Sequence, residues 1–364
     1  MSLLFIGSTG DRAGHSLITW AIARRLSEMG LRVGFSKPFA TNPIYWDGNW
    51  TDHDALLFKQ CLNLPYPLDQ ICPYPLTGDT WKEIGTDDIL RKFKSIVDKL
   101  SSENDILLIM GSKHIFFDDS SCPIPDIAVI NELNADFILI SRFRKISRSI
   151  YSILFAKSML KEKVKGFFLN RIPPETYEDT RCEIISSLTD KGIPCIATLQ
   201  EDPALSFRSL REIKDILSGE LLCGEERLDQ LVGRVTVGPN ALKGELRIFK
   251  MVYNKIILLA PFPMDEGIHE SLPRRTVAGI LLTGGRKPAV PVLEAAKNNH
   301  IPLMLVKEDT FSVLECLEKS PPRISHRDEA KVQQMRSLLD RDGVMDSLIK
   351  SLGLKGSHKN NFTF

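Results

Sequence analysis

Short apolar runs alternate with amphipathic stretches over the first two hundred residues. The runs are brief, rich in β-branched and aromatic residues, and end in Gly, Pro or polar residues, which is typical of buried parallel strands. They occupy residues 3–6, 31–37, 105–110, 136–140, 164–170 and 193–198. Helical periodicity lies between them, at residues 17–26, 88–100, 124–133, 146–160 and 176–191. This alternation predicts βαβ units and therefore an α/β fold with a doubly wound, mostly parallel sheet.

A second, smaller α/β block follows residue 206. Its strands are expected at residues 255–260, 277–282 and 302–306, and its helices at 209–217 and 289–298. From residue 323 the chain is charged, with helical patterns at 328–339 and 344–352 and an end that we expect to be disordered. We therefore divide the chain into domains at 1–206 and 207–322 and a C-terminal tail at 323–364.

The segment 42–79 shows little periodicity beyond a helical pattern at 54–61, and it carries several Pro and aromatic residues. Loops of this length in α/β domains often lie over the ligand-binding edge of the sheet. An inert surface excursion is the other interpretation, and the pattern alone does not choose between them.

Composition narrows the classes of partner. The 364 residues contain 47 Lys and Arg against 46 Asp and Glu, so no excess of positive charge favours nucleic acid. No apolar run approaches the roughly 18 residues of a membrane-spanning helix. The seven cysteines are scattered without a C-x-x-C pair, and the seven histidines form no ligand pattern, which is typical of a reducing cytoplasm and predicts no metal cluster.

The first apolar run leads into a turn and a helix with the layout of a phosphate-binding loop. Such a loop closes with Gly-Lys-Ser/Thr, in which the Lys reaches the phosphates and the hydroxyl holds Mg²⁺. Here the closing residues are Gly14-His15-Ser16, so the lysine is missing. Backbone N–H groups can still attract an anion, but phosphoryl transfer needs the positive charge. The candidate nucleotide-binding residues of this loop are Thr9, Gly10, Asp11, Arg12, Ala13, Gly14, His15 and Ser16.

Three of these side chains have competing interpretations. Arg12 either substitutes for the missing cation or is solvated. His15 is either a neutral, solvent-facing or capping residue or a pH-dependent phosphate contact. Ser16 either ligates a metal or phosphate or simply caps the helix.

Several motifs beyond the loop occur in a characteristic order. They are Gly34-Phe35-Ser36-Lys37-Pro38, Asp52-His53-Asp54-Ala55, Gly166-Phe167-Phe168-Leu169-Asn170-Arg171, and Gly192-Ile193-Pro194 followed by Gln200-Glu201-Asp202-Pro203. Through them, residues 1 to about 205 resemble the dethiobiotin-synthetase-like P-loop domain at the N-terminus of long phosphotransacetylases. The resemblance implies ATP or ADP with Mg²⁺ as cofactor. It further implies that Lys37 serves the phosphates, Asp54 and Ser16 ligate Mg²⁺, and Asn170 reads the base.

A second set of motifs falls in the smaller block. Residues 278–285, Pro288, 301–303 and Asp309-Thr310 resemble the DRTGG domain, which follows in the same phosphotransacetylases. The turn Thr283-Gly284-Gly285 would let a regulatory ligand or partner approach backbone N–H groups, although a plain strand-to-helix turn explains it equally well. Arg227 joins this candidate site because Glu226-Arg227 stands where the family has Asp-Arg. The family's first such turn has lost its glycines, since residues 259–263 read Leu-Ala-Pro-Phe-Pro.

Departures from the family weigh against catalysis. His15 replaces the loop lysine, Met110 stands where a metal-binding Glu is expected, and about 42 residues after Pro322 leave no room for the acetyltransferase domain. We therefore name no catalytic residue and expect a regulatory or scaffold protein that binds a nucleotide or metabolite. We expect a cytoplasmic homodimer without nucleic-acid or membrane partners, whose catalytic subunit would be a separate chain. The alternative is an ATP-dependent ligase or phosphotransferase of the dethiobiotin synthetase class, with Arg12 and Lys37 supplying the charge.

Overall fold

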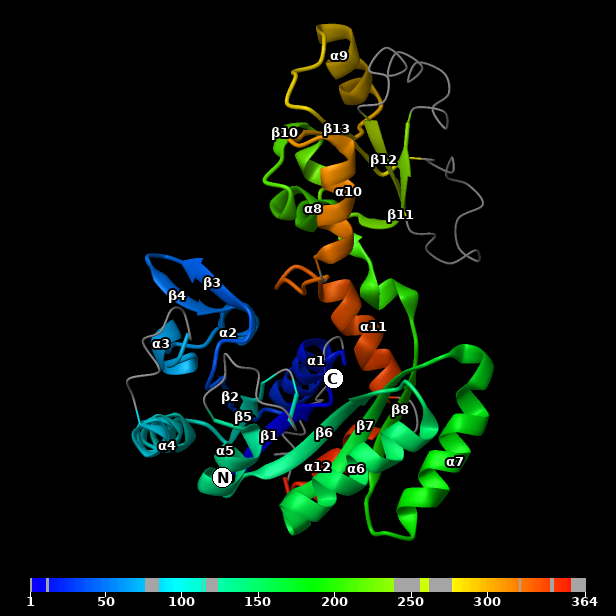
Figure 1. Cartoon of the computed structure of the whole chain (residues 1–364). Helices are drawn as coiled ribbons and strands as arrows, with labels where there is room; N and C mark the ends of the chain where they lie inside the picture. The colour runs from blue at the N-terminus through cyan, green and yellow to red at the C-terminus, as the bar shows by residue number, and fades with distance from the viewer. Residues whose placement is uncertain are drawn as a thin grey trace, which may run out of the picture. The chain divides into compact units, whose positions relative to one another are not determined.

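The chain forms two compact units, and the first of them is discontinuous (Figure 1). The computed structural model describes residues 2–10, 13–75, 85–112, 114–115, 124–238, 256–261, 277–320, 322–340 and 344–354. Unit 1 comprises Met1–Asp202 together with Ile324–Phe364, and unit 2 comprises Pro203–Arg323. The chain thus leaves unit 1, builds unit 2 and then returns to complete unit 1.

Unit 1 is built on a six-stranded sheet in the order β2-β5-β1-β6-β7-β8, in which every strand is parallel to its neighbours. The strands are β1 (Ser2–Ser8), β2 (Val33–Ser36), β5 (Ile106–Met110), β6 (Asp136–Arg142), β7 (Val164–Ile172) and β8 (Cys195–Gln200). Residues of β1, β5 and β6 are buried on both sides of the sheet, which explains their continuous apolar runs. The predicted doubly wound α/β fold is confirmed.

Helices cover both faces of this sheet. One layer consists of four helices, each in contact with the next: α4 (Thr86–Glu103), α5 (Asp126–Leu133), α6 (Ile146–Leu160) and α7 (Tyr177–Thr189). The other layer holds α1 (His15–Glu28), α11 (Glu329–Asp340) and α12 (Val344–Ser351). Among the described residues, no helix is both long and apolar enough to cross a bilayer.

The C-terminal helices therefore complete the sparser layer of unit 1. Helix α11 packs along α1, and α12 contacts β8. Arg24 on α1 binds Glu329 at 2.7 Å, and Glu28 binds Arg336 at 2.6 Å. The sequence predicted both helices, and the structure shows which surface they cover.

Between β2 and α4 lies a hairpin that the sequence analysis treated as irregular. Strands β3 (Pro43–Trp46) and β4 (Asn49–Asp52) pair antiparallel and lead into α2 (His53–Cys61) and α3 (Leu68–Ile71). The two connecting residues, Asp47 and Gly48, have φ values of 47° and 80°. Left-handed backbone at both positions is typical of the Asp-Gly hairpin turn.

Unit 2 is a six-stranded mixed sheet in the order β10-β14-β13-β12-β11-β9. Its strands are β9 (Arg208–Ser209), β10 (Glu220–Cys223), β11 (Leu231–Val237), β12 (Ile256–Pro261), β13 (Gly279–Leu282) and β14 (Leu303–Leu305). Only β13 and β14 pair in parallel among these described strands. Strands β9, β10 and β11 were not predicted: β9 has only two residues and β10 four, and Gly233 and Arg234 interrupt the apolar run of β11.

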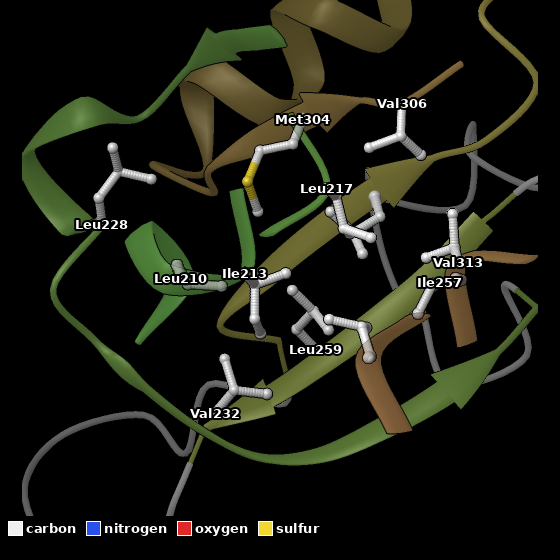
Figure 2. Close-up of a cluster of buried hydrophobic side chains, with 12 residues drawn as sticks. Leu210, Ile213, Leu217, Leu228, Val232, Ile257, Leu259, Met304, Val306 and Val313 are labelled. Carbon is white, nitrogen blue, oxygen red and sulfur yellow. The ribbon is translucent and has the colours of Figure 1, made fainter. Parts of the chain in front are cut away.

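Alternate residues of the unit 2 strands enter two separate cores. Leu281 and Met304 join the core under α8 (Leu210–Ile216) and α10 (Thr310–Lys319), which Figure 2 shows. Ile280 and Leu303 face the opposite core, under α9 (Val290–Asn298). Helices therefore cover both faces of this sheet as well.

Candidate functional site

The candidate site of unit 1 lies at the carboxyl edge of its sheet. Strand β1 leads into the loop 9–14, β2 into Lys37, and β5 into Gly111, while Asn170 lies near the end of β7. Because β2, β5 and β1 are consecutive in the sheet, the first three segments are neighbours at this edge. Open parallel sheets bind their ligands at the same place.

The phosphate loop is held in place by Asn170. Gly14 has a φ of 86°, and a Cβ atom at this position would lie 2.4 Å from Asn170 Nδ2. That amide donates a hydrogen bond to the Ala13 carbonyl at 2.8 Å, and its oxygen accepts one from Arg171 N at 2.9 Å. Asn170 thus already uses one N–H and one lone pair within the loop region. Asp11 and Arg12 lie outside the described residues, so their roles stay predictions.

The remaining loop residues support local structure. The Thr9 hydroxyl accepts a hydrogen bond from Arg142 N at 3.2 Å, which ties β1 to β6. Gly10 N donates to Ser8 Oγ at 3.2 Å. Ser16 is half-buried in the first turn of α1, a turn without an acidic residue. The partial positive charge at the N-terminus of α1 therefore remains available to an anion.

His15 is half-buried at the start of α1, with one ring nitrogen shielded from solvent. Its Nε2 atom is buried and has no hydrogen-bond partner among the described residues. Burial lowers the pKa of His15 to about 4, and the nearby positive charge of Lys37 lowers it as well. The charge of Asp54 and a hydrogen bond with the Gly111 backbone raise the pKa, but by less than the other two effects lower it. The imidazole is therefore neutral at neutral pH, at the position where a phosphate loop normally carries a cation.

Lys37 is fully buried and bound to two carboxylates. Its Nζ lies 2.7 Å from Asp54 Oδ2 and 3.2 Å from Asp52 Oδ1. Burial alone would lower the pKa of Lys37, but the charges of Asp52 and Asp54 outweigh it and raise the pKa above its usual value. Burial alone would likewise raise the pKa of Asp54, but Lys37 outweighs it and the pKa falls well below its usual value. Lys37 and Asp54 therefore stay ionised at neutral pH.

Asp52 has a second task that the sequence motif did not reveal. It is the N-cap of α2, where its carboxylate accepts hydrogen bonds from Asp54 N at 2.7 Å and from Asn42 N at 2.8 Å. The end of the hairpin, the start of α2 and the Lys37 ammonium thus meet at one side chain.

The position expected to hold a metal-binding Glu carries a thioether. Met110 is fully buried, with its Sδ 4.0 Å from Lys37 Nζ. Asp126, a buried carboxylate at the start of α5 that the sequence analysis missed, accepts hydrogen bonds from Ser112 N at 3.0 and 2.9 Å. A Cβ atom at Gly111 would lie 2.3 Å from Asp126 Oδ2, so this carboxylate braces the loop after β5. The described residues contain no group of three or more His, Cys, Asp or Glu that could hold a metal ion.

In unit 2 the Thr283 turn closes on the loop after β14. Gly284 N and Gly285 N donate to the Glu308 and Val306 carbonyls at 2.8 and 2.9 Å, and the hydroxyls of Thr283 and Thr310 lie 2.8 Å apart. Both glycines have positive φ, 83° and 70°. The N–H groups that we expected a ligand to approach are therefore already engaged.

Arg227 is not brought to this turn. Its guanidinium donates to the His300 carbonyl at 2.8 Å and to Gln230 at 2.9 Å. His300 precedes β14, whereas the Thr283 turn follows β13, and these two strands are parallel. Arg227 and the turn consequently lie at opposite edges of the sheet of unit 2.

Comparison with known proteins supports two adjoining modules. Residues 2–209 match the family described as AAA domain, and residues 212–320 match the DRTGG domain. The chain is similar to a phosphate acetyltransferase of Synechocystis, with 23% identity over 96% of this chain and 52% of that protein. It is also similar to a phosphate acetyltransferase of Nitratidesulfovibrio vulgaris, with 25% identity over 93% of this chain and 50% of that protein.

The first module alone has shorter relatives. An ATP-dependent dethiobiotin synthetase BioD of Thermodesulfovibrio yellowstonii is 27% identical over 54% of this chain and 87% of its own length. The chain spans about half the length of the phosphate acetyltransferases that it matches. The resemblance inferred from the motifs is confirmed for both modules.

Proposed function

The chain belongs to the AAA domain family through residues 2–209, and from this membership we propose that it is a regulatory or scaffold module with a degenerate phosphate loop. In this proposal it binds a phosphate-bearing metabolite, and a nucleotide in the first instance, without transferring the phosphoryl group. The observation that carries the proposal is the pairing of Lys37 with Asp52 and Asp54 beside a neutral His15.

The charge of the described site argues against phosphoryl transfer. The one positive charge of Lys37 is balanced against the two negative charges of Asp52 and Asp54, which leaves a net charge of −1. Phosphoryl transfer needs positive charge at the developing transition state, and each well-placed donor or cation contributes about 3–4 kcal/mol. Lys37, the cation at the β2 side of the site, is already paired with these two carboxylates.

The residues present fit Mg²⁺ poorly. Ser16 and Asp54 would hold the ion, but an Asp54 oxygen lies 2.7 Å from Lys37 Nζ. The third expected position carries the soft sulfur of Met110, whereas Mg²⁺ prefers oxygen ligands. The N-terminus of α1 and the turn at Gly14 still offer a site for an anion, so binding is retained in our proposal and metal-assisted chemistry is not.

The test is isothermal titration of the wild-type protein and the variant His15→Lys with ATP and ADP, with and without Mg²⁺. We expect wild-type binding that Mg²⁺ barely changes, tighter binding by His15→Lys because the net charge of the site rises to zero, and no release of phosphate. Absence of binding at millimolar ligand would refute the sensing role. Mg²⁺-dependent ATP turnover that Lys37→Ala abolishes would instead establish the ligase or phosphotransferase of the dethiobiotin synthetase class.

Two further parts of the proposal concern partners. We propose that the protein is a homodimer and that unit 2 takes a regulatory ligand or partner near Thr283, Gly284, Gly285 or Arg227. Sedimentation equilibrium tests the first statement, and titration of Arg227→Ala and Thr283→Val with candidate metabolites tests the second. We further propose a separate catalytic subunit as a partner, which co-sedimentation with this protein would detect.

A further inference from the structure

The outward face of α6 carries a stripe of large apolar side chains. Tyr151, Phe155 and Met159 are 72%, 49% and 46% exposed, and they follow one another at intervals of four residues. Residues at this interval lie on the same face of an α-helix, one turn after another. Within the described helices, no other carries more than one large apolar side chain of this exposure. We call these three residues the α6 stripe.

The opposite face of α6 already packs within unit 1. The residues buried there are Ser149, Ile153, Ala156 and Leu160, and α6 contacts β6 and β7 of the sheet. Its neighbours in the same layer are α5 and α7. The α6 stripe therefore faces away from the sheet, on the side where a helix at the surface of a domain is normally polar.

The α6 stripe is large enough to form the centre of a protein interface. Side chains of about 150–250 Å² each, exposed to roughly one half to three quarters, present on the order of 300 Å² of apolar surface. Contiguous apolar patches of this size are typical of interaction sites. A stable interface takes about 800 Å² from each partner, with an apolar centre and a polar rim, so polar residues around the stripe would supply the remainder.

Charges of opposite sign flank the α6 stripe. Arg148 is exposed and lies seven residues before Phe155, whereas Glu162 lies seven residues after it, in the short 3-10 helix Lys161–Lys163. Seven residues are about two helical turns, so Arg148 lies on the same face as the stripe. The side chain of Glu162 is 97% exposed, and its ion pair with Lys157 is 3.8 Å long.

The lysines beside Glu162 do not share its direction. Lys163 Nζ is turned toward the Ile130 carbonyl, which it approaches to 3.4 Å. Lys157 is only 24% exposed. The exposed carboxylate of Glu162 is therefore available to a cation from another molecule.

This order of side chains is complementary to itself. When a second α6 packs antiparallel to the first, with a two-fold axis at Phe155, each residue before Phe155 meets the one equally far after it on the other subunit. Tyr151 then faces Met159 of the partner subunit. Arg148 likewise faces Glu162 of the partner subunit, and the axis repeats both contacts. Helices that cross at about 20° stay in contact over several turns, with their axes about 8–10 Å apart.

We propose that the α6 stripe is the surface through which two copies of this chain associate, with the two α6 helices antiparallel and Phe155 at the two-fold axis. The inference rests on the homodimer of the proposed function and assigns its interface, but it does not depend on nucleotide binding. A lipid surface matches less well, because a helix that lies on a membrane inserts its widest apolar face, and in α6 that face is engaged with the sheet.

The test measures the dimer dissociation constant by analytical ultracentrifugation for the wild type, Phe155→Asp and Trp46→Asp. Trp46 is a matched control because it is equally exposed, at 49%, but lies on the β3–β4 hairpin. We expect Phe155→Asp to raise the dissociation constant about 100-fold or more, because two carboxylates would meet at the axis. Trp46→Asp should leave it unchanged. Circular dichroism of both variants checks that the fold is intact.

A charge exchange tests the antiparallel register. Arg148→Glu and Glu162→Arg each replace attraction by repulsion at two places related by the axis, so each should raise the dissociation constant about tenfold at low salt. The double variant Arg148→Glu/Glu162→Arg restores opposite charges and should bring the constant back near the wild-type value. Single variants without effect, or a double variant as weak as the single ones, would overturn this register.

The outcomes separate this interface from the proposed function. A wild-type dimer that Phe155→Asp leaves intact would overturn the interface and leave the homodimer standing. A wild-type protein that is monomeric at every concentration tested would overturn both. If that monomer bound phosphatidylserine vesicles and Phe155→Asp did not, the α6 stripe would be a lipid-binding surface instead. Titration of the wild type with ATP tests the phosphate site independently, so failure of ATP to bind would refute the sensing role without affecting the interface.

Discussion

Replacing Lys37 by Met is expected to destabilise unit 1 strongly, because it leaves two buried carboxylates without their cation. Asp52 keeps two backbone N–H donors, at 2.7 and 2.8 Å, so it remains solvated by the protein. Asp54 loses an ammonium at 2.7 Å and is itself only 4% exposed. Breaking a buried ion pair by removing one partner costs about 3–5 kcal/mol, and we expect the free energy of unfolding to fall by that amount.

A double variant separates the ion pair from simple loss of packing. The double variant Lys37→Met/Asp54→Asn removes both the ammonium of Lys37 and the carboxylate charge of Asp54. The second substitution should therefore restore part of the stability that Lys37→Met loses, with a coupling energy of about 2 kcal/mol or more between the two positions. The control is Lys94→Met, which breaks a pair with Glu132 at 3.2 Å whose side chains are 47% and 42% exposed. Exposed pairs contribute about 0–1 kcal/mol, so this variant should behave like the wild type.

The assay is urea unfolding followed by tryptophan fluorescence. All four tryptophans, Trp20, Trp46, Trp50 and Trp81, belong to unit 1, so this signal reports unit 1 alone. The pKa of Asp54 is lowered in the fold, so the contribution of the pair is complete above pH of about 4 and is lost as the pH falls further. The gap between the wild type and Lys37→Met should therefore narrow in acid. A Lys37→Met protein within about 1 kcal/mol of the wild type at pH 7, or strictly additive effects of the two substitutions, would refute this account of the site.

Three further predictions concern single residues. The pKa of His15 falls from 6.5 to about 4 on folding, so between these pH values the imidazole is protonated in the unfolded chain but not in the folded one. The free energy of unfolding of the wild type should therefore drop by about 3 kcal/mol from pH 7 to pH 4. Urea unfolding at each pH measures this drop, which should be smaller in His15→Gln. Gly14→Ala should lower the free energy of unfolding by about 2 kcal/mol or more, because the backbone is left-handed there and the new methyl group would collide with Asn170. Adding Asn170→Ala should remove the collision but not the backbone strain, so it should restore only part of the loss. Thermal unfolding of the single and double variants would show this. Thr283→Val removes a hydrogen bond of 2.8 Å between the hydroxyls of Thr283 and Thr310 in unit 2. Hydrogen exchange should show the stability of that unit lowered by about 1 kcal/mol. Unchanged exchange of the β13 amides would contradict this prediction.

Much of the fold could be predicted because parallel strands buried on both faces leave continuous apolar runs. Local signals were weaker where strands are short or half exposed. The Asp47-Gly48 turn is a recognised hairpin signal, but Pro43 and the flanking polar residues obscured the two-residue alternation around it. The helical pattern at 328–339 likewise predicted an amphipathic helix without saying which surface it would cover, since periodicity defines a face and not its partner.

The candidate site could be predicted as a set of residues but not as a set of contacts. Motif order pointed to Lys37, Asp54 and Asn170, and all three lie at the edge of the unit 1 sheet. It did not predict that Asp52 would share the lysine, or that the amide of Asn170 would turn to the Ala13 carbonyl, because both depend on side-chain directions set by distant segments. The burial of His15 and the resulting fall in its pKa have the same origin.

The discontinuity of unit 1 has a consequence for how the protein is made. A ribosome releases β1 to β8 first and the residues of α11 only after the 121 residues of unit 2 (Pro203–Arg323). Until then, α11 does not yet cover the surface of α1 that carries Arg24 and Glu28. The loop that precedes α1 should therefore reach its final rigidity only after α11 has been synthesised, since domains generally fold as units. A nascent chain stalled after residue 202 would carry every motif of the phosphate site while its first helix is still uncovered on one side.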